Sequence, residues 1–395
     1  MPPVRRGPRA KTKIRLVSVW ATLLLLLSIC IWRWHHVSML QSTPVVVTSL
    51  QSSDDCPYPY ERHSVDDIKK GQVPYLFGGE RKPSCRHCSS GATWSNFCRF
   101  DNALPGNPAC GADRKKWLID GFLERGFHDI LTITPCDLFP LVKARNIWIV
   151  GDSQSLDLSK ALQCFLHEFW DLRLNNATEN FPALAPTLNQ LRSAVCSDFA
   201  DNTRMCYLRA DQPHTVLNLV LPILSVAGTP KDLVILNVGL HYTPDYPSEL
   251  GKIATAFTAQ KLKLPHLLWM DTPPQHFHTD FGEYPRDSSK PPFNCWYIGK
   301  AENKDPLTLS KDHQLTTSDP KYQHVADGGW RNVIARPLML SAGIPVLQIW
   351  NESMLLWNYH RDNGAGWECT HYCFPSAPQV WVYHLLRKLQ ELNRV

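Results

Sequence analysis

The sequence predicts an α/β fold: a three-layer domain built on a central parallel sheet. Four apolar runs end in small or polar residues, as strands buried on both faces of a sheet do. Segments with helical spacing of apolar residues separate these runs, which is typical of βαβ units. The first run passes through Gly-Asp-Ser directly into a helix, over residues 146–169. A disulfide-rich segment and an N-terminal transmembrane helix are expected to precede this domain.

The N-terminus predicts a basic cytosolic tail followed by a membrane anchor. Residues 1–15 contain six Lys or Arg and no acid, so the formal net charge of +5 becomes 5 − 6, about −1, for the rest. The folded part therefore has no general basic character, and we expect no nucleic-acid partner. We expect a transmembrane signal anchor over residues 16–34, whose basic N-terminal flank indicates a cytosolic N-terminus and a lumenal remainder.

The length of the anchor favours the Golgi membrane. Its uncharged run of 17 residues, 16–32, spans about 25 Å as a helix, which suits a thin bilayer. A cleaved signal peptide is the alternative, but the bulky residues 32–36 do not resemble a cleavage site. We therefore expect a single-pass type II Golgi protein with a single N-terminal helix in the membrane.

The cysteines predict disulfides in an oxidising compartment. Apart from Cys30 in the anchor, twelve cysteines remain, an even number. Residues 35–55 are expected to form a stem, and 56–136 a cysteine-rich segment. Cys85 and Cys88 have the spacing of zinc ligands but lack a matching second pair, so a disulfide is favoured and no metal is expected. Asn176 and Asn351 begin sequons and are candidate glycosylation sites.

Residues 137–395 are expected to form the catalytic domain. Its predicted strands are residues 146–150, 215–220, 231–239, 265–271 and 343–350. Residues 117–123 are expected to be the one ordered helix before it, and residues 279–330 a long excursion from the sheet. Ser376 and Gln379 form a capping box that opens the last helix, with an apolar face at Val382, Leu385, Leu386 and Leu389.

Ser153 is the first candidate catalytic residue. It follows the first strand, at the carboxyl end where ligands bind in α/β sheets and where the next helix dipole stabilises negative charge. The alternative is that Ser153 is only the N-cap of that helix. A serine needs a base to take its proton, and the base needs a third group to orient it.

His371 and Glu368 are the candidate base and orienting acid. His371 lies on a short loop held by Cys369, Cys373 and the capped last helix, which is a rigid mounting, and Glu368 comes three residues before it. We expect Cys295 or an N-terminal cysteine to pair with Cys369 or Cys373 and clamp this loop. The alternatives are a structural histidine and a solvated surface acid.

Two later turns supply candidate contacts to substrate. Asn237 and Gly239 lie at the end of a buried strand, and their amide groups are possible oxyanion donors or parts of a simple turn. His276 follows the next strand and is a candidate substrate contact or a loop residue.

Together these motifs resemble the SGNH (GDSL-type) hydrolase superfamily, and within it the PC-esterase group with the plant trichome birefringence-like proteins and sialate O-acetyltransferases. The resemblance covers residues from about 117 to 395. The matching segments are Cys136-Asp137-Leu138, Gly151-Asp152-Ser153, Asn237-x-Gly239-x-His241, Thr272-Pro-Pro-Gln-His276-Phe277 and Glu368-Cys369-Thr370-His371-Tyr372-Cys373. The sequence departs from the group at Glu368, where the group has Asp, and at Gln154, where it has an aliphatic residue.

The resemblance implies lumenal O-acyl transfer, chiefly of acetyl, to or from glycan hydroxyls. Ser153 would form an acyl-enzyme, and Gly151, Asp152, Asn237, Gly239, His241 and His276 would bind substrate or the oxyanion. It implies a serine-dependent O-acetyltransferase or carbohydrate esterase without bound cofactor or metal. Acetyl-CoA or an acetylated intermediate would be the co-substrate, and a polysaccharide or glycoprotein glycan the partner.

Two other functions fit the predicted layout. A Golgi glycosyltransferase shares the type II arrangement, but the chain has no Asp-x-Asp motif, so only a metal-independent enzyme would fit. A catalytically inactive glycan-binding protein on the same fold is the second alternative, because Glu368 replaces the usual Asp.

Overall fold

The computed structural model describes residues 56, 60–79, 110–279, 281–285, 295–298, 307–362 and 367–394. The predicted tail, membrane anchor and stem lie outside these ranges, as do Cys85 and Cys88. Within the ranges, no helix is both long and apolar enough to cross a bilayer.

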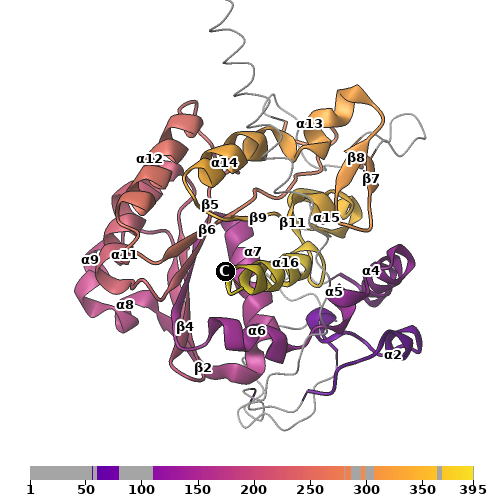
Figure 1. Cartoon of the computed structure of the whole chain (residues 1–395), viewed down its shortest axis with the longest axis horizontal. Helices are drawn as coiled ribbons and strands as arrows, with labels where there is room; N and C mark the ends of the chain where they lie inside the picture. The colour runs from indigo at the N-terminus through magenta and orange to yellow at the C-terminus, as the bar shows by residue number, and fades with distance from the viewer. Residues whose placement is uncertain are drawn as a thin grey trace, which may run out of the picture. The chain divides into compact units, whose positions relative to one another are not determined.

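The centre of the fold is a seven-stranded sheet in the order β2-β3-β4-β1-β5-β6-β9 (Figure 1). In this sheet β4, β1, β5, β6 and β9 run parallel to one another, and β3 and β2 extend the sheet with antiparallel pairing. Their bounds are β1 Asn146–Gly151, β2 Trp170–Asn176, β3 Ala194–Phe199, β4 Thr203–Arg209, β5 Leu233–Asn237, β6 His266–Met270 and β9 Val346–Leu347. The mostly parallel α/β sheet confirms the predicted fold class at this level.

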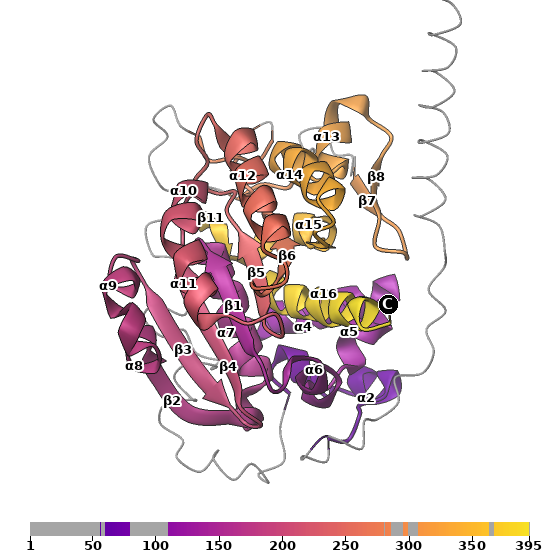
Figure 2. The same ribbon diagram turned by 60° about the vertical axis from the view of Figure 1, so that its left-hand side comes forward.

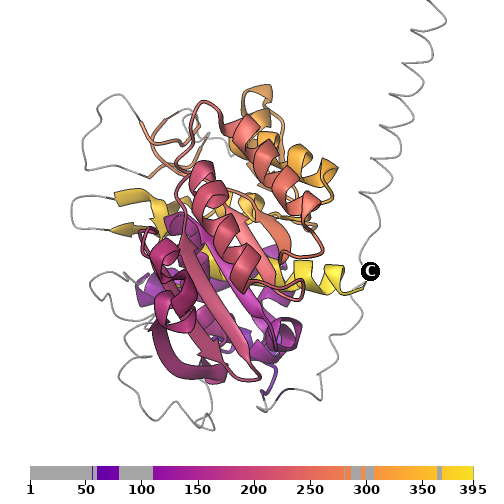
Figure 3. The same ribbon diagram turned by 90° about the vertical axis from the view of Figure 1, so that its left-hand side faces the viewer.

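Alternating residues of β1 explain the three layers. Ile147 and Ile149 belong to one hydrophobic cluster, whereas Trp148 and Val150 belong to another on the opposite face. Both faces of the strand are therefore buried under helices (Figures 2 and 3). This is why its sequence is continuously apolar.

Helices from both ends of the chain cover the first face. They are α2 Val65–Lys69, η1 Tyr75–Phe77, α4 Ala112–Arg125, α5 His128–Thr132, α6 Pro135–Val142, α7 Ser153–Phe165, η3 His167–Phe169 and α16 Ala377–Leu392. The other face is covered mainly by α8 Ala177–Asn180, η4 Pro182–Leu184, α9 Ala185–Leu188, α10 Pro213–Thr215, η5 Val216–Val220, α11 Leu221–Ala227, α12 Tyr246–Ala259 and α14 Gly329–Ser341.

Smaller elements complete the fold beside the sheet. A third cluster joins a hairpin to nearby helices, namely β7 Leu307–Leu309, β8 Leu315–Thr317, η7 Pro320–Tyr322, α13 Gln323–Ala326 and α15 Trp350–Met354. A second hairpin follows, consisting of η8 Trp357–Tyr359, β10 His360–Asp362 and β11 Trp367–Tyr372.

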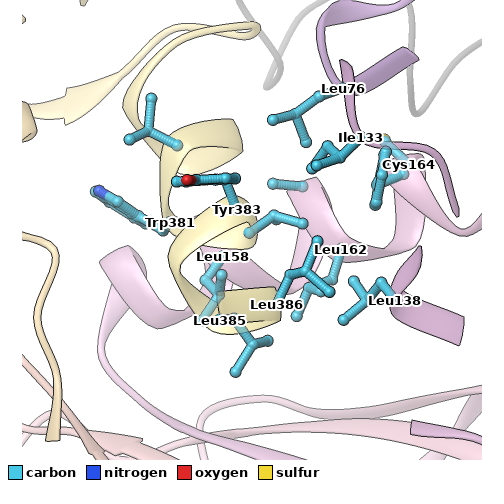
Figure 4. Close-up of a cluster of buried hydrophobic side chains, with 14 of the residues drawn as sticks. Leu76, Ile133, Leu138, Leu158, Leu162, Cys164, Trp381, Tyr383, Leu385 and Leu386 are labelled. Carbon is cyan, nitrogen blue, oxygen red and sulfur yellow. The ribbon is translucent and has the colours of Figure 1, made fainter. Parts of the chain in front are cut away.

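Helix α16 packs its apolar face on α7 and on the N-terminal helices (Figure 4). It begins with the predicted capping box of Ser376 and Gln379, and its four predicted apolar positions are buried. Leu76 and Ile133, from before residue 137, enter the same cluster. The described part of residues 56–136 therefore shares one hydrophobic core with the sheet, and α6 crosses the expected boundary at residue 136.

The predicted strand at residues 215–220 is wrong. Pro213 opens a helix there, and Val216, Val220, Ile223 and Leu224 are all buried, at helical rather than alternating spacing. The strands β2, β3 and β4, which pair antiparallel with one another at one end of the sheet, were not predicted. Residues 117–123 lie in α4 as expected, but they are not the only ordered helix of their segment, because α2 and α5 are also present.

Leu386→Ala tests the contact between α16 and α7. The side chain is fully buried, so the substitution removes apolar contacts and leaves a cavity. We expect the free energy of unfolding, measured by urea titration, to fall by about 2–5 kcal/mol. The matched control is Leu262→Ala, at a leucine that is 83% exposed, with an expected change within about 0.5 kcal/mol. Equal losses would contradict this packing.

Candidate active site

Ser153 lies at the tight junction between β1 and α7. Gly151 has a positive φ of 148°, and a Cβ on it would lie 2.1 Å from the carbonyl oxygen of Asn237 on β5. Only glycine fits there. Asp152 is the N-cap, since its carboxylate accepts the Gln154 N–H at 2.9 Å. Ser153 is therefore the first helical residue rather than the N-cap, and capping does not occupy its hydroxyl.

The structure brings Ser153, His371 and Glu368 into one chain of contacts. The Ser153 Oγ and His371 Nε2 are 2.5 Å apart although the residues are 218 positions apart in sequence. His371 Nδ1 donates to Glu368 Oε2. The Glu368 carboxylate also accepts the backbone N–H groups of Thr370 and His371, each at 3.0 Å. Glu368 thus orients the imidazole and leaves Nε2 to face the serine.

The pKa shifts of the pair follow from this geometry. Burial alone would lower the pKa of His371, but the hydrogen bond to Glu368 and the charge of Asp157 outweigh it, so the pKa is raised. Burial would raise the pKa of Glu368, but its hydrogen bonds and the charge of His371 outweigh burial and the pKa is lowered. The acid therefore stays ionised and stabilises a protonated His371.

Three side chains join the serine helix to the β11 strand. Gln154 Nε2 donates to the Thr370 carbonyl at 3.2 Å. Asp157, one helical turn after Ser153, forms an ion pair with Arg361 on β10. Arg361 Nε donates to the Tyr372 carbonyl at 2.9 Å. Sequence reasoning missed Asp157 and Arg361, although the i+4 spacing of Asp157 from Ser153 on the helix was a usable signal.

Two disulfides hold the strand that bears His371. Cys295 pairs with Cys369, and Cys110 pairs with Cys373. Both bonds agree with the expected clamp. The partner of Cys369 is Cys295, and the partner of Cys373 is an N-terminal cysteine, Cys110. The backbone N–H of His276 also donates to the Cys369 carbonyl at 2.9 Å.

Asn237 does not offer its side-chain amide to an oxyanion in this structure. Its Nδ2 donates to the Met270 carbonyl at 3.0 Å and to Thr272 Oγ1 at 3.1 Å, so both hydrogens are engaged. The side chain instead joins the ends of β5 and β6. Gly239 packs against Thr272, where a Cβ would lie 1.8 Å from Oγ1. Neither the Gly239 nor the Ser153 backbone N–H donates to a residue within the described ranges.

Asp152 and His241 lie near the serine but are not in its contact chain. Asp152 is fully buried, and burial raises the pKa of its carboxyl despite the Gln154 N–H and the charges of His241 and His371. Within the described ranges its Oδ2 has no hydrogen-bond partner. His241 is exposed, so it is accessible to a ligand.

The prediction that His276 contacts substrate is wrong. The side chain is fully buried, and its ring nitrogens contact His360 Nε2 at 2.7 Å and the Met354 carbonyl at 3.1 Å. Burial lowers the pKa of His276 to about 3. His360 in turn donates from Nδ1 to the His371 carbonyl at 3.0 Å. His276 and His360 therefore support the backbone beneath His371.

The two sequons lie in different settings. Asn176 is the last residue of β2, and its side chain is not among those that the structure describes. Asn351 lies on α15, where its side-chain amide donates to the His313 carbonyl at 2.8 Å and Ser353 is fully buried. In the folded chain Asn351 thus has a structural contact.

Comparisons with protein-family models and with curated proteins gave no match. Among solved structures, the chain is similar to Axe2, an acetylxylan esterase from Geobacillus stearothermophilus, with a TM-score of 0.31 and 8% identity over 64% of this chain and 96% of that one. A catalytic mutant of Axe2 gives a TM-score of 0.29 and 7% identity over 62% and 94%. At these values the likeness supports no argument about this chain.

Asp157→Asn should shift the pH dependence of turnover. Protonated His371 cannot accept the serine proton, so kcat/KM should rise with pH through the raised pKa of His371, above 6.5. Removing the Asp157 charge, and leaving Arg361 unpaired, should lower this pKa and move the acid limb to lower pH. The measurement is the pH profile of ester hydrolysis.

Asp198→Asn is the matched control, because Asp198 pairs with Arg204 on the antiparallel edge. Its acid limb should coincide with that of the unmodified protein. A limb that does not move in Asp157→Asn would contradict the electrostatic role of Asp157.

Proposed function

We propose that this protein transfers an acyl group, chiefly acetyl, to or from glycan hydroxyls through an acyl-enzyme on Ser153. The observation that supports it is the contact chain from Ser153 Oγ through His371 to Glu368. This arrangement has the nucleophile, base and orienting acid that a serine acyl-transfer enzyme requires. The half-buried state of Ser153 and His371 keeps both within reach of a substrate.

The first half-reaction forms the acyl-enzyme. His371 Nε2 takes the Ser153 proton while Oγ attacks the acyl carbonyl of the donor. Glu368 stabilises the resulting imidazolium. The tetrahedral intermediate then expels the donor's leaving group, which receives the proton from His371. In the second half-reaction a sugar hydroxyl or water attacks the acyl carbon, His371 takes its proton, and Ser153 is released with that proton returned.

The Ser153 and Gly239 backbone N–H groups are the proposed oxyanion donors. Gly151 and Asn237 are register partners at the ends of β1 and β5. Ser153 and Gly239 each come two residues after this pair, so the chain reaches both from adjacent points of the sheet. Ser153 also begins α7, where the helix dipole favours negative charge. Backbone amides hold their position without rotamer freedom, which suits them to this role.

The motif set supports membership of the SGNH superfamily, with the PC-esterase group as the finer proposal. A glycan acceptor, from a polysaccharide or glycoprotein, and an acetyl donor such as acetyl-CoA belong to the same proposal. The disulfides support an oxidising compartment. Localisation as a type II protein of the Golgi membrane is proposed on the N-terminal sequence alone.

Ser153→Ala tests the function directly. Both forms of the protein, secreted from a eukaryotic host, are incubated with an activated acetyl ester and a panel of plant, algal and animal oligosaccharides. Mass spectrometry follows the acetyl group. We expect serine-dependent acetyl on a sugar, or serine-dependent acetate, and a loss of roughly 10³-fold or more in the variant. Equal rates in both forms would exclude the acyl-enzyme and favour the glycan-binding alternative.

A Glu368 series tests the orienting acid. Glu368→Gln keeps the size of the side chain but removes the charge that supports the imidazolium, so we expect kcat to fall by about 10²-fold or more. Glu368→Asp should retain more activity than Glu368→Ala. Circular dichroism and the melting temperature serve as controls for folding. Full activity in Glu368→Ala would refute the assignment.

A further inference from the structure

A second cluster of ionisable side chains is formed by elements that do not contribute to the Ser153 contact chain. His313 comes from the β7–β8 hairpin, Glu352 from α15 and His384 from α16 (Figure 2). One ligand atom from each residue lies within 4.8 Å of the other two. Residue spacing in the sequence gives no sign of this cluster, because its members are separated by tens of residues.

The Glu352 carboxylate is the centre of the cluster. Its Oε1 is 2.6 Å from His313 Nδ1, and its Oε2 is 3.0 Å from His384 Nε2. The carboxylate is almost completely buried, with 4% of its side chain exposed. Two imidazoles and one carboxylate are a common zinc ligand set, with bonds of about 2.0–2.2 Å.

The contact between His384 and Glu352 is poorly aligned for a hydrogen bond. Its Nε2 is buried and, within the described ranges, has no partner in hydrogen-bond geometry, although a carboxylate oxygen is 3.0 Å away. A buried ring nitrogen that lies beside an acid without a well-aligned hydrogen bond is poorly used by the protein alone. A cation between the two atoms would use the lone pairs of both.

The ligands are also held in place. Ring stacking of Phe127 on His313, with centroids 4.4 Å apart, and the Asn351 amide on the His313 carbonyl fix the hairpin residue. Trp381 Nε1 donates to Ser353 Oγ at 2.8 Å, which fixes α16 against α15. Such supporting contacts are what orient the ligands of metal sites in proteins.

We propose that His313, Glu352 and His384 bind one divalent transition-metal ion, zinc in particular, which ties the β7–β8 hairpin to α15 and α16. With neutral imidazoles the three ligands bear one negative charge, which suits a cation. The imidazole side chains are 25% and 16% exposed, so the cluster lies close to the surface, where water could complete a four-coordinate site. Asp129 adds negative charge near His313, and Arg387 adds positive charge.

The role of this ion is structural and separate from the acyl-transfer chemistry. None of the three ligands takes part in the contact chain of Ser153, His371 and Glu368. The bound ion would add a further link between three separate elements of the fold. Its binding free energy would therefore add to the stability of this corner of the fold.

The test measures zinc on the full-length protein, purified in mild detergent without a histidine tag. After treatment with EDTA and dialysis against micromolar ZnCl₂, metal content is determined by mass spectrometry. We expect the unmodified protein to retain one more zinc ion per chain than Glu352→Gln and His384→Gln. In competition with a chromophoric chelator, each variant should bind zinc at least about tenfold more weakly, since even indirect supports of a metal site cost that much.

Thermal melting provides the second readout. At about a hundredfold excess of zinc over its dissociation constant, the melting temperature should rise by roughly 5 °C in the unmodified protein and not in the variants. His266→Gln, at an exposed histidine on β6, and Ser153→Ala should both respond as the unmodified protein does. His384→Gln, at the more exposed ligand, decides the matter if Glu352→Gln does not fold.

Two results would overturn the proposal. One is no zinc retained by the unmodified protein, which would leave the cluster as an ion pair only. The other is equal zinc content and equal melting shifts in the unmodified protein and in both ligand variants. Because Ser153→Ala retains the ligands, failure of the acyl-transfer proposal would not change either result.

Discussion

The contact between Ser153 and His371 is the constraint on which the site depends. A serine hydroxyl gains nucleophilicity only while its base lies within hydrogen-bond distance, and small displacements of a reacting group cost large factors in rate. Here the two residues come from the N-terminus of α7 and from β11, 218 positions apart. The fold must therefore hold a helix and a hairpin in one fixed relation.

That relation is maintained by several kinds of interaction at once. Gln154 and Asp157 reach from the serine helix to the backbone and side chains of the hairpin, while the disulfide of Cys369 ties the strand from its other side. Helix α16 follows the hairpin directly and packs on α7, so the hydrophobic core positions both partners together. Deep in the protein, His276 and His360 carry a hydrogen-bonded chain up to the His371 carbonyl.

Environment, rather than residue type, separates the histidines of this protein. His371 combines partial exposure with a carboxylate partner, and its pKa is raised. His276 is fully buried beside another imidazole and a backbone carbonyl, and burial lowers its pKa to about 3. His313 and His384 share a buried carboxylate away from that contact chain. The same side chain thus serves as candidate base, structural support and candidate metal ligand according to burial and the nearest charge.

The sequence by itself determined the elements whose signal is local. The apolar runs of β1, β5 and β6 have to be buried on both faces, the capping box sets the start of α16, and Gly151-Asp152-Ser153 predicts a strand-to-helix turn. The contact chain of Ser153, His371 and Glu368 was also predictable, because the candidate nucleophile, base and acid lie in locally distinctive motifs. The local pattern gave a wrong strand at residues 215–220, because a short run of apolar residues buried on one side is compatible with either a helix or a strand.

Only the tertiary structure decided which side chains meet. Asn237 and His276 occupied plausible positions at or after strand ends, yet the Asn237 amide is engaged by the end of β6 and His276 is buried beside His360. The pairing of Asp157 with Arg361, and of Glu352 with two histidines, joins residues from separate elements. Contacts of this kind depend on how helices are placed on the sheet, and local patterns along the chain do not reveal that placement.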